Sequence, residues 1–209
     1  MNIINFGAGP CQLSKDLLKT TRDDIINYKE TGISIYELSH HTDMWTELYS
    51  ETVNNAKNFL EIPNTHECFF MNGGGTHQFP TIYYNLCNSE SKVQVLVSGF
   101  WSQKAVNEFK KFCKVVVVNN VNDLIDSPDY VFTYYCENET TIGYEFRNGL
   151  SFDPKSHFLI SDMCSILGSK SIDISKYGII FSSLSKNLGI SGSTLIIAKK
   201  DILQRPKLI

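Results

Sequence analysis

The sequence predicts an α/β fold with a parallel or mixed sheet covered by helices on both faces. Short apolar runs alternate with longer segments of helical character, which is the pattern of a covered sheet. Three apolar runs between residues 157 and 198 are bounded by turn residues and have the length of fully buried strands. The 209 residues, 42% of them hydrophobic and 20% charged, are enough for one sizeable core. We therefore expect a single globular domain.

The first part of the chain is predicted to be mostly helical. A helix is expected over 14–28, because the serine that begins it is a good N-cap. Its apolar side chains lie on one side: Leu17, Leu18, Ile25 and Ile26. An extended segment is expected over 33–38. A second helix over 42–60 follows, with Thr42 or Asp43 as its cap.

From residue 68 onward, strands and helices are predicted to alternate. Strands are expected at residues 68–71, 93–97, 115–118, 130–135, 157–162, 177–184 and 195–198. Helices are expected after the first two of these strands, reaching about residue 87 and spanning 100–112. This order indicates connected strand–helix units and hence a sheet with parallel neighbours.

Composition excludes several classes of protein. The net charge is −3 and acids and bases are interspersed, so nothing indicates a nucleic-acid partner. No apolar run approaches the roughly 20 residues that span a bilayer. The first residues lack a basic segment followed by a long apolar one, so no signal peptide is expected. The six cysteines show no C-x-x-C spacing, which argues against a metal site or a disulfide framework and favours a cytoplasmic location.

An acid and an amine follow two of the buried strands, Asp162 and Lys186. Ligands of open α/β sheets bind at the carboxyl ends of strands. Such a pair suits pyridoxal phosphate, because the lysine can hold the aldehyde as a Schiff base and the acid can keep the pyridine nitrogen protonated. An ordinary ion pair or two solvated loop charges would be the more common explanation of these two residues taken alone.

Three further segments follow predicted strands. The three glycines within 72–78 let the backbone approach a ligand, and the helix after them offers N–H groups to a phosphate. Trp101 can stack on a flat ring. Residues 137–143 supply hydroxyls and an amide at the same sheet edge. A plain glycine-rich turn and a core tryptophan are the alternatives to these interpretations.

Taken together, these motifs resemble the fold-type I pyridoxal-phosphate enzymes and, more narrowly, the phosphoserine aminotransferase family. Seven segments carry the resemblance: residues 5–10, 32–40, 73–79, 99–102, 138–140, 162–165 and 185–189. It covers essentially the whole chain. It implies a pyridoxal-phosphate-binding large domain over 1–209, with an N-terminal segment at 1–15 and a mainly parallel seven-stranded sheet. The family's small C-terminal domain is expected to be absent.

The resemblance also implies roles for individual residues. Lys186 corresponds to the catalytic Schiff-base lysine and Asp162 to the catalytic partner of the pyridine nitrogen. The other expected cofactor contacts are ring stacking by Trp101, a bond from Thr140 to the phenolic oxygen, a phosphate cradle at Gly75 and Thr76, and Ser185, where the family usually has glutamine. His40 and His41 take the substrate-binding positions, His41 where the family usually has arginine.

The activity implied is an amino transfer of serine biosynthesis by a cytoplasmic homodimer. An amino group would pass from glutamate to 3-phosphohydroxypyruvate, which gives 2-oxoglutarate and O-phosphoserine. Two alternatives remain: an inactive fragment or dimerisation partner that keeps the fold, and another fold-type I enzyme such as a cysteine desulfurase. A desulfurase needs a catalytic cysteine beyond the lysine, and no cysteine follows Lys186.

Overall fold

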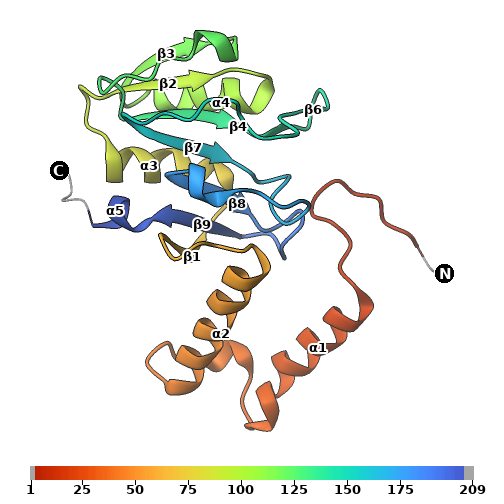
Figure 1. The fold of residues 1–209 in the computed structure, drawn as a ribbon. Helices are drawn as coiled ribbons and strands as arrows, with labels where there is room; N and C mark the ends of the chain where they lie inside the picture. Colours follow the sequence, from red (N-terminus) through yellow and green to blue (C-terminus); the bar gives the residue numbers. More distant parts are fainter. Residues whose placement is uncertain (1–2, 205–209) are drawn as a thin grey trace.

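The computed structural model describes residues 3–204, which contain one seven-stranded sheet in the order β1-β9-β8-β7-β4-β2-β3 (Figure 1). Its strands are β1 (His66–Asn72), β2 (Lys92–Leu96), β3 (Lys114–Val118), β4 (Phe132–Cys136), β7 (Phe158–Asp162), β8 (Ile179–Ser183) and β9 (Ser193–Lys199). Strand β9 is antiparallel to both β1 and β8, while the remaining pairs are parallel. The predicted mainly parallel, seven-stranded sheet is therefore confirmed.

The direction of the strands decides where a site can form. Because β9 alone is reversed among the described strands of this sheet, β1 runs in the same direction as β8, β7, β4 and β2. The carboxyl ends of these strands therefore lie at one edge of the sheet. The loops after them bring residues far apart in the sequence to that edge.

Helices α3 (Gln78–Leu86), α4 (Phe100–Phe109) and the short α5 (Lys200–Leu203) cover one face of the sheet. Alternate strand residues such as Phe132 and Tyr134 point to this face, as the two-residue period of a strand requires. Phe79 from α3 and Phe109 from α4 pack edge-on against Tyr134, and Phe109 also packs against Phe132 at a tilt. This face contains the larger aromatic core.

The opposite face is covered by α2 (Asp43–Phe59) and by the irregular segments around residues 146–177. Val53 and Ala56 of α2 pack against a cluster that includes Tyr135 and Ile180 of the strands. Helices thus contribute to both faces, as predicted, although loops complete the second one. Residues 66–203 are called the sheet unit below.

Residues 3–60, called the N-terminal layer below, consist of an arm, α1 (Lys15–Ile26), two 3₁₀ turns and α2. The predicted caps are confirmed: Leu17 N–H donates to Ser14 Oγ at 3.1 Å, and Trp45 N–H donates to Thr42 Oγ1 at 3.4 Å. Helix α1 buries none of its residues, and Leu18 is 51% exposed. In Figure 1, α1 and α2 lie below the sheet, and the arm runs up beside the loops at its edge.

The predicted extended segment over 33–38 is wrong. Residues Ile35–Glu37 form a 3₁₀ turn, η2, that begins at Ser34. Ser34 Oγ accepts the N–H of Tyr36, and Ser34 N–H donates to Glu37 Oε2 at 2.8 Å. This reciprocal pairing is a capping box, and its Ser-x-x-Glu pattern stabilises a helical turn rather than a strand.

The smaller elements complete the chain. They are η1 (Tyr28–Glu30), η3 (Gly75–His77), η4 (Val121–Asp123), η5 (Ile174–Lys176) and the hairpin strands β5 (Asn138–Glu139) and β6 (Tyr144–Glu145). The hairpin and α5 were not predicted from the sequence. Within residues 3–204, no helix has both the length and the apolar character needed to cross a membrane.

Candidate active site

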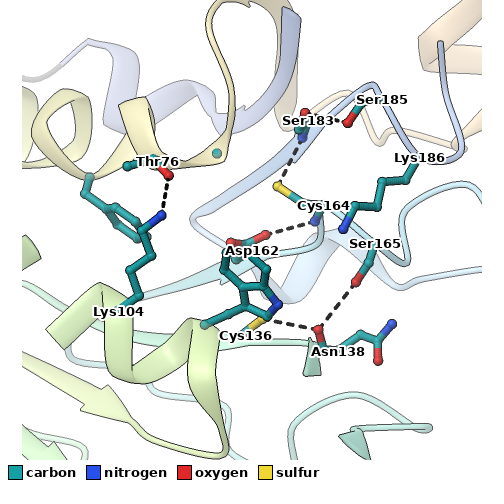
Figure 2. A pocket seen from close by; sticks show the side chains of 13 residues that line it. Thr76, Lys104, Cys136, Asn138, Asp162, Cys164, Ser165, Ser183, Ser185 and Lys186 are labelled. Carbon is teal, nitrogen blue, oxygen red and sulfur yellow. Dashed lines mark hydrogen bonds between the residues drawn. The ribbon is translucent and has the colours of Figure 1, made fainter. Parts of the chain in front are cut away.

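The loops at the carboxyl edge of the sheet enclose a cavity of about 200 Å³. Six of the residues singled out from the sequence line it: Gly75, Thr76, Trp101, Asp162, Ser185 and Lys186. Figure 2 shows Thr76, Asp162 and Lys186 around one space. The six residues come from segments that follow or end β1, β2, β7 and β8. The strand order therefore assembles the cavity.

Asp162 is the last residue of β7 and is 9% exposed. Its Oδ1 accepts the backbone N–H of Cys164 at 2.9 Å. Burial raises the pKa of this carboxyl, whereas the hydrogen bonds from Cys164 and the charge of Lys186 lower it. A cationic ligand group beside the carboxylate would act in the same direction as Lys186 and favour the charged form.

Lys186 lies in the turn after β8 and extends into the cavity, where its Nζ is 6.0 Å from the ring centroid of Trp101. The turn is fixed by its neighbour Asn187, whose Nδ2 donates to the carbonyls of Ser165 and Leu167 at 3.3 and 3.2 Å. The lysine backbone is thereby tied to the loop that follows Asp162.

The N-terminal arm passes directly against this lysine. Cys11 N–H donates to the Ser185 carbonyl at 3.2 Å. Gly9 has a φ of 155°, and a Cβ built there would come within 3.1 Å of the Cγ and Cε of Lys186. Glycine is favoured at this position because the backbone angle strains other residues and a side chain would crowd Lys186. The arm thus forms part of the wall around Lys186.

The glycines after β1 allow an equally close approach. Gly73 has a φ of 96°, which other residues rarely adopt, and a Cβ on Gly75 would lie 2.9 Å from Cys164 Sγ. Gly75 and Thr76 begin η3, which continues into α3. The first N–H groups of a helix have no intrahelical partner, so they are available to an anion in the cavity.

Trp101, in the first turn of α4, and Thr140, just after β5, contact each other. The indole Nε1–H donates to Thr140 Oγ1 at 3.0 Å. Thr140 itself is exposed and does not line the cavity. The fully buried Glu139 accepts the backbone N–H groups of Trp101 and Ser102 at 2.8 and 2.7 Å. Glu139 therefore positions both the start of α4 and the tryptophan.

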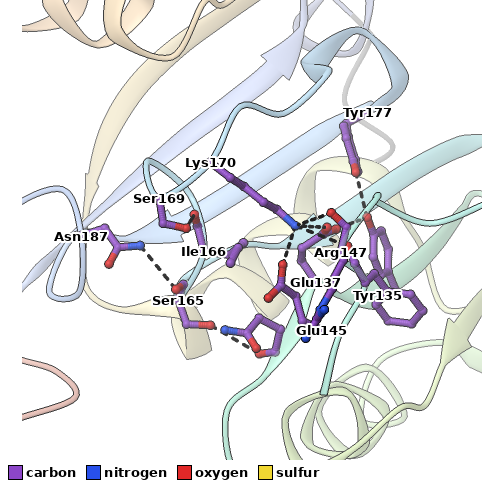
Figure 3. A network of polar contacts seen from close by, with 12 residues as sticks. Tyr135, Glu137, Glu145, Arg147, Ser165, Ile166, Ser169, Lys170, Tyr177 and Asn187 are labelled. Atoms are coloured by element: carbon purple, nitrogen blue, oxygen red, sulfur yellow. Dashed lines mark hydrogen bonds and ion pairs between the residues drawn. The ribbon is translucent and has the colours of Figure 1, made fainter. Parts of the chain in front are cut away.

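A polar network holds the loop that carries Thr140 (Figure 3). Lys170 Nζ donates to Glu145 Oε1 at 2.7 Å and to the Arg147 carbonyl at 3.1 Å. It also lies 3.5 Å from the buried carboxylate of Glu137, which accepts a hydrogen bond from the hydroxyl of Tyr135. Burial raises the pKa of Glu137, and the bonds from Tyr135 and Lys170 lower it. The network joins the loops that follow β4 and β7.

His40 and His41 do not reach this cavity. Both are exposed in the turn before α2, with their ring centroids 3.8 Å apart. The ring of His40 also lies 6.4 Å from that of Trp45. The structure thus places them on the N-terminal layer, and their substrate-binding role stays a prediction.

Several residues that line the cavity were given no role by the sequence analysis, among them Lys104 and Cys164. Lys104 lies three positions after Trp101 on α4, and residues at this spacing share a helix face. Cys164 accepts the N–H of Ser183 at 3.1 Å, and burial raises the pKa of its thiol. The helical spacing was a usable signal for Lys104, whereas the contact of Cys164 depends on two separate loops.

The chemistry available is that of a buried acid, a primary amine, an aromatic face and a glycine-lined helix start around one cavity. Among the described residues, no group of three or more His, Cys, Asp or Glu side chains is arranged to hold a metal ion. The set suits a flat ring that carries an anionic group and a carbonyl.

Comparison with known proteins gives a consistent result. A family model described as aminotransferase class-V matches residues 3–208. Phosphoserine aminotransferase 1, chloroplastic, from Arabidopsis thaliana is 35% identical over 96% of this chain and 49% of the relative. Phosphoserine aminotransferase from Drosophila melanogaster is 31% identical over 96% of this chain and 58% of the relative. The chain therefore spans about half the length of the curated relatives it matches.

Solved structures give the same family. The phosphoserine aminotransferase of Trichomonas vaginalis with bound pyridoxal phosphate superposes with a TM-score of 0.88 at 31% identity, over 99% of this chain and 64% of the other. The enzyme from Bacillus circulans subsp. alkalophilus superposes with a TM-score of 0.89 at 26% identity, over 98% and 59%. The fold-type I architecture predicted from the sequence is confirmed.

Proposed function

The chain belongs to the aminotransferase class-V family, and from that premise we propose that it acts as a phosphoserine aminotransferase with pyridoxal phosphate as its cofactor. The reaction transfers the amino group of glutamate to 3-phosphohydroxypyruvate and gives 2-oxoglutarate and O-phosphoserine. One observation carries the proposal: Asp162, Lys186 and Trp101 line a single cavity, in a chain whose curated relatives bear this name.

The residues present fit this cofactor. Trp101 offers a face for the pyridine ring, and Asp162 offers a buried carboxylate for its nitrogen. Lys186 supplies the amine that binds the aldehyde. The start of η3 at Gly75 and Thr76 supplies backbone donors for the phosphate. This cradle is closely built, because a Cβ at Gly75 would lie only 2.9 Å from Cys164 Sγ.

When bound, pyridoxal phosphate supplies an aldehyde that exchanges amines and a ring that takes up the electron pair released at the substrate's α-carbon. The chain's own residues create the conditions for this chemistry. Asp162, whose Oδ1 accepts the Cys164 N–H, would supply a negative charge to the ring nitrogen. Lys186 Nζ accepts and returns the proton at the α-carbon as a general base and acid. The arm at Gly9 and Cys11 restricts water around that amine.

We propose further that substrate binding uses His40 and His41, and that two copies of the chain form a homodimer. Both histidines are exposed and outside the cavity of their own chain, so a second copy is one way to bring them to a site. The arm and α1 expose large apolar side chains, among them Phe6 at 90% and Ile26 at 70%. Exposed apolar patches of this kind mark protein interfaces. Light scattering that gives the mass of a single chain would contradict the homodimer.

A cytoplasmic location is also proposed. All six cysteines lie in the described range, and each is a free thiol. Free thiols are typical of a reducing compartment. Fractionation of cells that express the tagged chain tests the location, and recovery from an oxidising compartment would contradict it.

The activity is tested by absorbance. The chain is mixed with pyridoxal phosphate, and its spectrum is recorded before and after addition of phosphoserine, glutamate or alanine. We expect phosphoserine and glutamate to convert the bound cofactor to its amine form and alanine to do so far more slowly. Cofactor binding without any conversion would favour the inactive alternative. Fastest conversion by alanine would favour a different fold-type I enzyme.

A further inference from the structure

Lys104 is a second lysine at the cavity, and it has a defined position there. It is half-buried on α4, and its Nζ donates to Thr76 Oγ1 at 2.9 Å. The same Nζ lies 5.6 Å from the ring centroid of Trp101. Figure 2 shows Lys104 and Lys186 on opposite sides of the cavity, with Asp162 between them. The two lysine amines therefore lie at different ends of the same cavity.

The surroundings of Lys104 leave its charge available. Its hydrogen-bond partner, Thr76, and its ring partner, Trp101, are both uncharged. A lysine side chain has many rotamers, so fixing it in one position costs conformational entropy. A single hydrogen bond to a hydroxyl group offsets only part of that cost. An anion bound beside Thr76 would complete the arrangement.

A second source of positive potential converges on the same point. Gly75 and Thr76 begin η3, and the chain continues directly into α3, which runs to Leu86. The start of such a helical segment carries free N–H groups and a partial positive charge. A fixed ammonium group and a helix start thus face the same part of the cavity, whereas the acid, Asp162, lies toward its middle (Figure 2).

We propose that Lys104 binds the phosphate monoester of the cofactor, with the Thr76 hydroxyl shared between the lysine and the phosphate. The inference rests on the proposed function for the identity of the ligand and deepens it by naming the cationic residue at its phosphate end. A charged hydrogen bond of this kind changes affinity by about 10- to 100-fold. The effect depends on the phosphate and not on the ring.

Two probes isolate the phosphate, pyridoxamine phosphate and pyridoxamine. Neither has the aldehyde that reacts with Lys186, so both bind without a covalent bond. Dissociation constants are measured by tryptophan fluorescence for the parent chain, Lys104→Met, Lys104→Arg and the control Lys110→Met. Lys110 is exposed at the end of α4, so its substitution removes the same charge beside the same helix.

We expect Lys104→Met to raise the dissociation constant of pyridoxamine phosphate about 10- to 100-fold and that of pyridoxamine less than about 3-fold. Lys104→Arg and Lys110→Met should both stay within about 3-fold of the parent for both probes, since each leaves a positive charge at position 104. If Lys104→Met lowers the affinity for both probes equally, Lys104 only supports Trp101. If it lowers neither affinity, Lys104 does not contact the ligand. Either result overturns the inference.

Failure of the proposed function gives a different result. If the parent binds neither probe, the cofactor assignment and this inference fall together. If the parent binds both probes equally well, only the phosphate contact is overturned. Should Lys104→Met lose its native circular dichroism, Lys104→Gln and Lys104→Arg decide the matter, because they differ in charge and share a long polar side chain. Equal affinity of those two variants for pyridoxamine phosphate would overturn the inference.

Discussion

The sheet unit and the N-terminal layer differ sharply in how they are packed. Within residues 3–60, Tyr28 is the one buried side chain. In the sheet unit, all five residues of β4 are buried, and its centre consists of fully buried rings and aliphatic side chains. The sheet unit buries most of its apolar side chains within the single chain, whereas the N-terminal layer packs only part of α2 against the sheet and leaves the arm and α1 exposed.

This difference separates two parts of the proposed function. The residues proposed to hold the cofactor, apart from the arm that contacts Lys186, belong to the sheet unit and are positioned by strand ends and buried networks. The residues proposed to bind substrate, His40 and His41, belong to the exposed layer. Stability and cofactor binding should therefore follow the sheet unit, while turnover and assembly should follow the N-terminal layer.

The largest effect on stability is expected in the sheet unit. Phe109 is fully buried and packs against the rings of Phe79, Phe132 and Tyr134. Phe109→Ala should lower the free energy of unfolding by about 3–5 kcal/mol, because it removes burial and leaves a cavity. Urea unfolding followed by circular dichroism measures the change. A loss below about 1 kcal/mol would show that the core is not the main support of the fold.

Asp162→Asn should separate catalysis from cofactor binding. The amide keeps the shape of the carboxyl but supplies no charge to a protonated ring nitrogen. We expect the cofactor to be retained and amino transfer to fall about 100- to 1,000-fold, the range for losing one fixed electrostatic group. Single-turnover rates with phosphoserine test this. Rates within a few-fold of the parent would remove Asp162 from its catalytic role.

Trp101→Ala should act mainly on cofactor affinity. Stacking on an aromatic ring contributes about 1 kcal/mol beyond the area it buries. The variant should therefore bind pyridoxal phosphate about 5- to 10-fold more weakly, with a smaller change in the rate at saturation. A large fall in rate at unchanged affinity would contradict the stacking role.

The smallest effect on stability is expected in the N-terminal layer. Leu18 is 51% exposed on α1. Leu18→Ala should change the free energy of unfolding of the single chain by less than about 0.5 kcal/mol. Its effect should instead appear in assembly, as a larger fraction of single chains in light scattering. A destabilisation as large as that of Phe109→Ala, measured under conditions where the chain is monomeric, would break the comparison between the two regions.

The sheet and most of the cavity could be predicted because the sequence patterns that indicate them lie within short stretches of the chain. The buried runs that end at Asp162 and just before Lys186 defined strands, and the parallel order of strands placed their ends together. The Ser14 and Thr42 caps were correct because N-cap chemistry involves only the next few residues. The error at 33–38 came from overlooking the same local chemistry in the Ser34–Glu37 capping box.

The residues that were missed depend on contacts between distant segments. Lys104 meets Thr76 across 28 positions of sequence, and Glu139 meets Trp101 across 38. Helical spacing places Lys104 on the same face of α4 as Trp101, but neither hydrogen-bond partner is indicated locally, since each pairing requires the packing of α4 against the loops at the sheet edge. The same limit applies to α1, whose apolar side was recognised from its spacing although nothing local indicates what covers it.

The most direct test of the central claim is to locate the cofactor's point of attachment in the parent chain. The chain is incubated with pyridoxal phosphate, reduced with borohydride, digested and mapped by mass spectrometry, with Lys186→Ala treated in parallel. We expect a single label on the peptide that contains Lys186 and loss of that label in the variant. Label on Lys104, label spread over exposed lysines such as Lys29, or undiminished labelling of Lys186→Ala would contradict it.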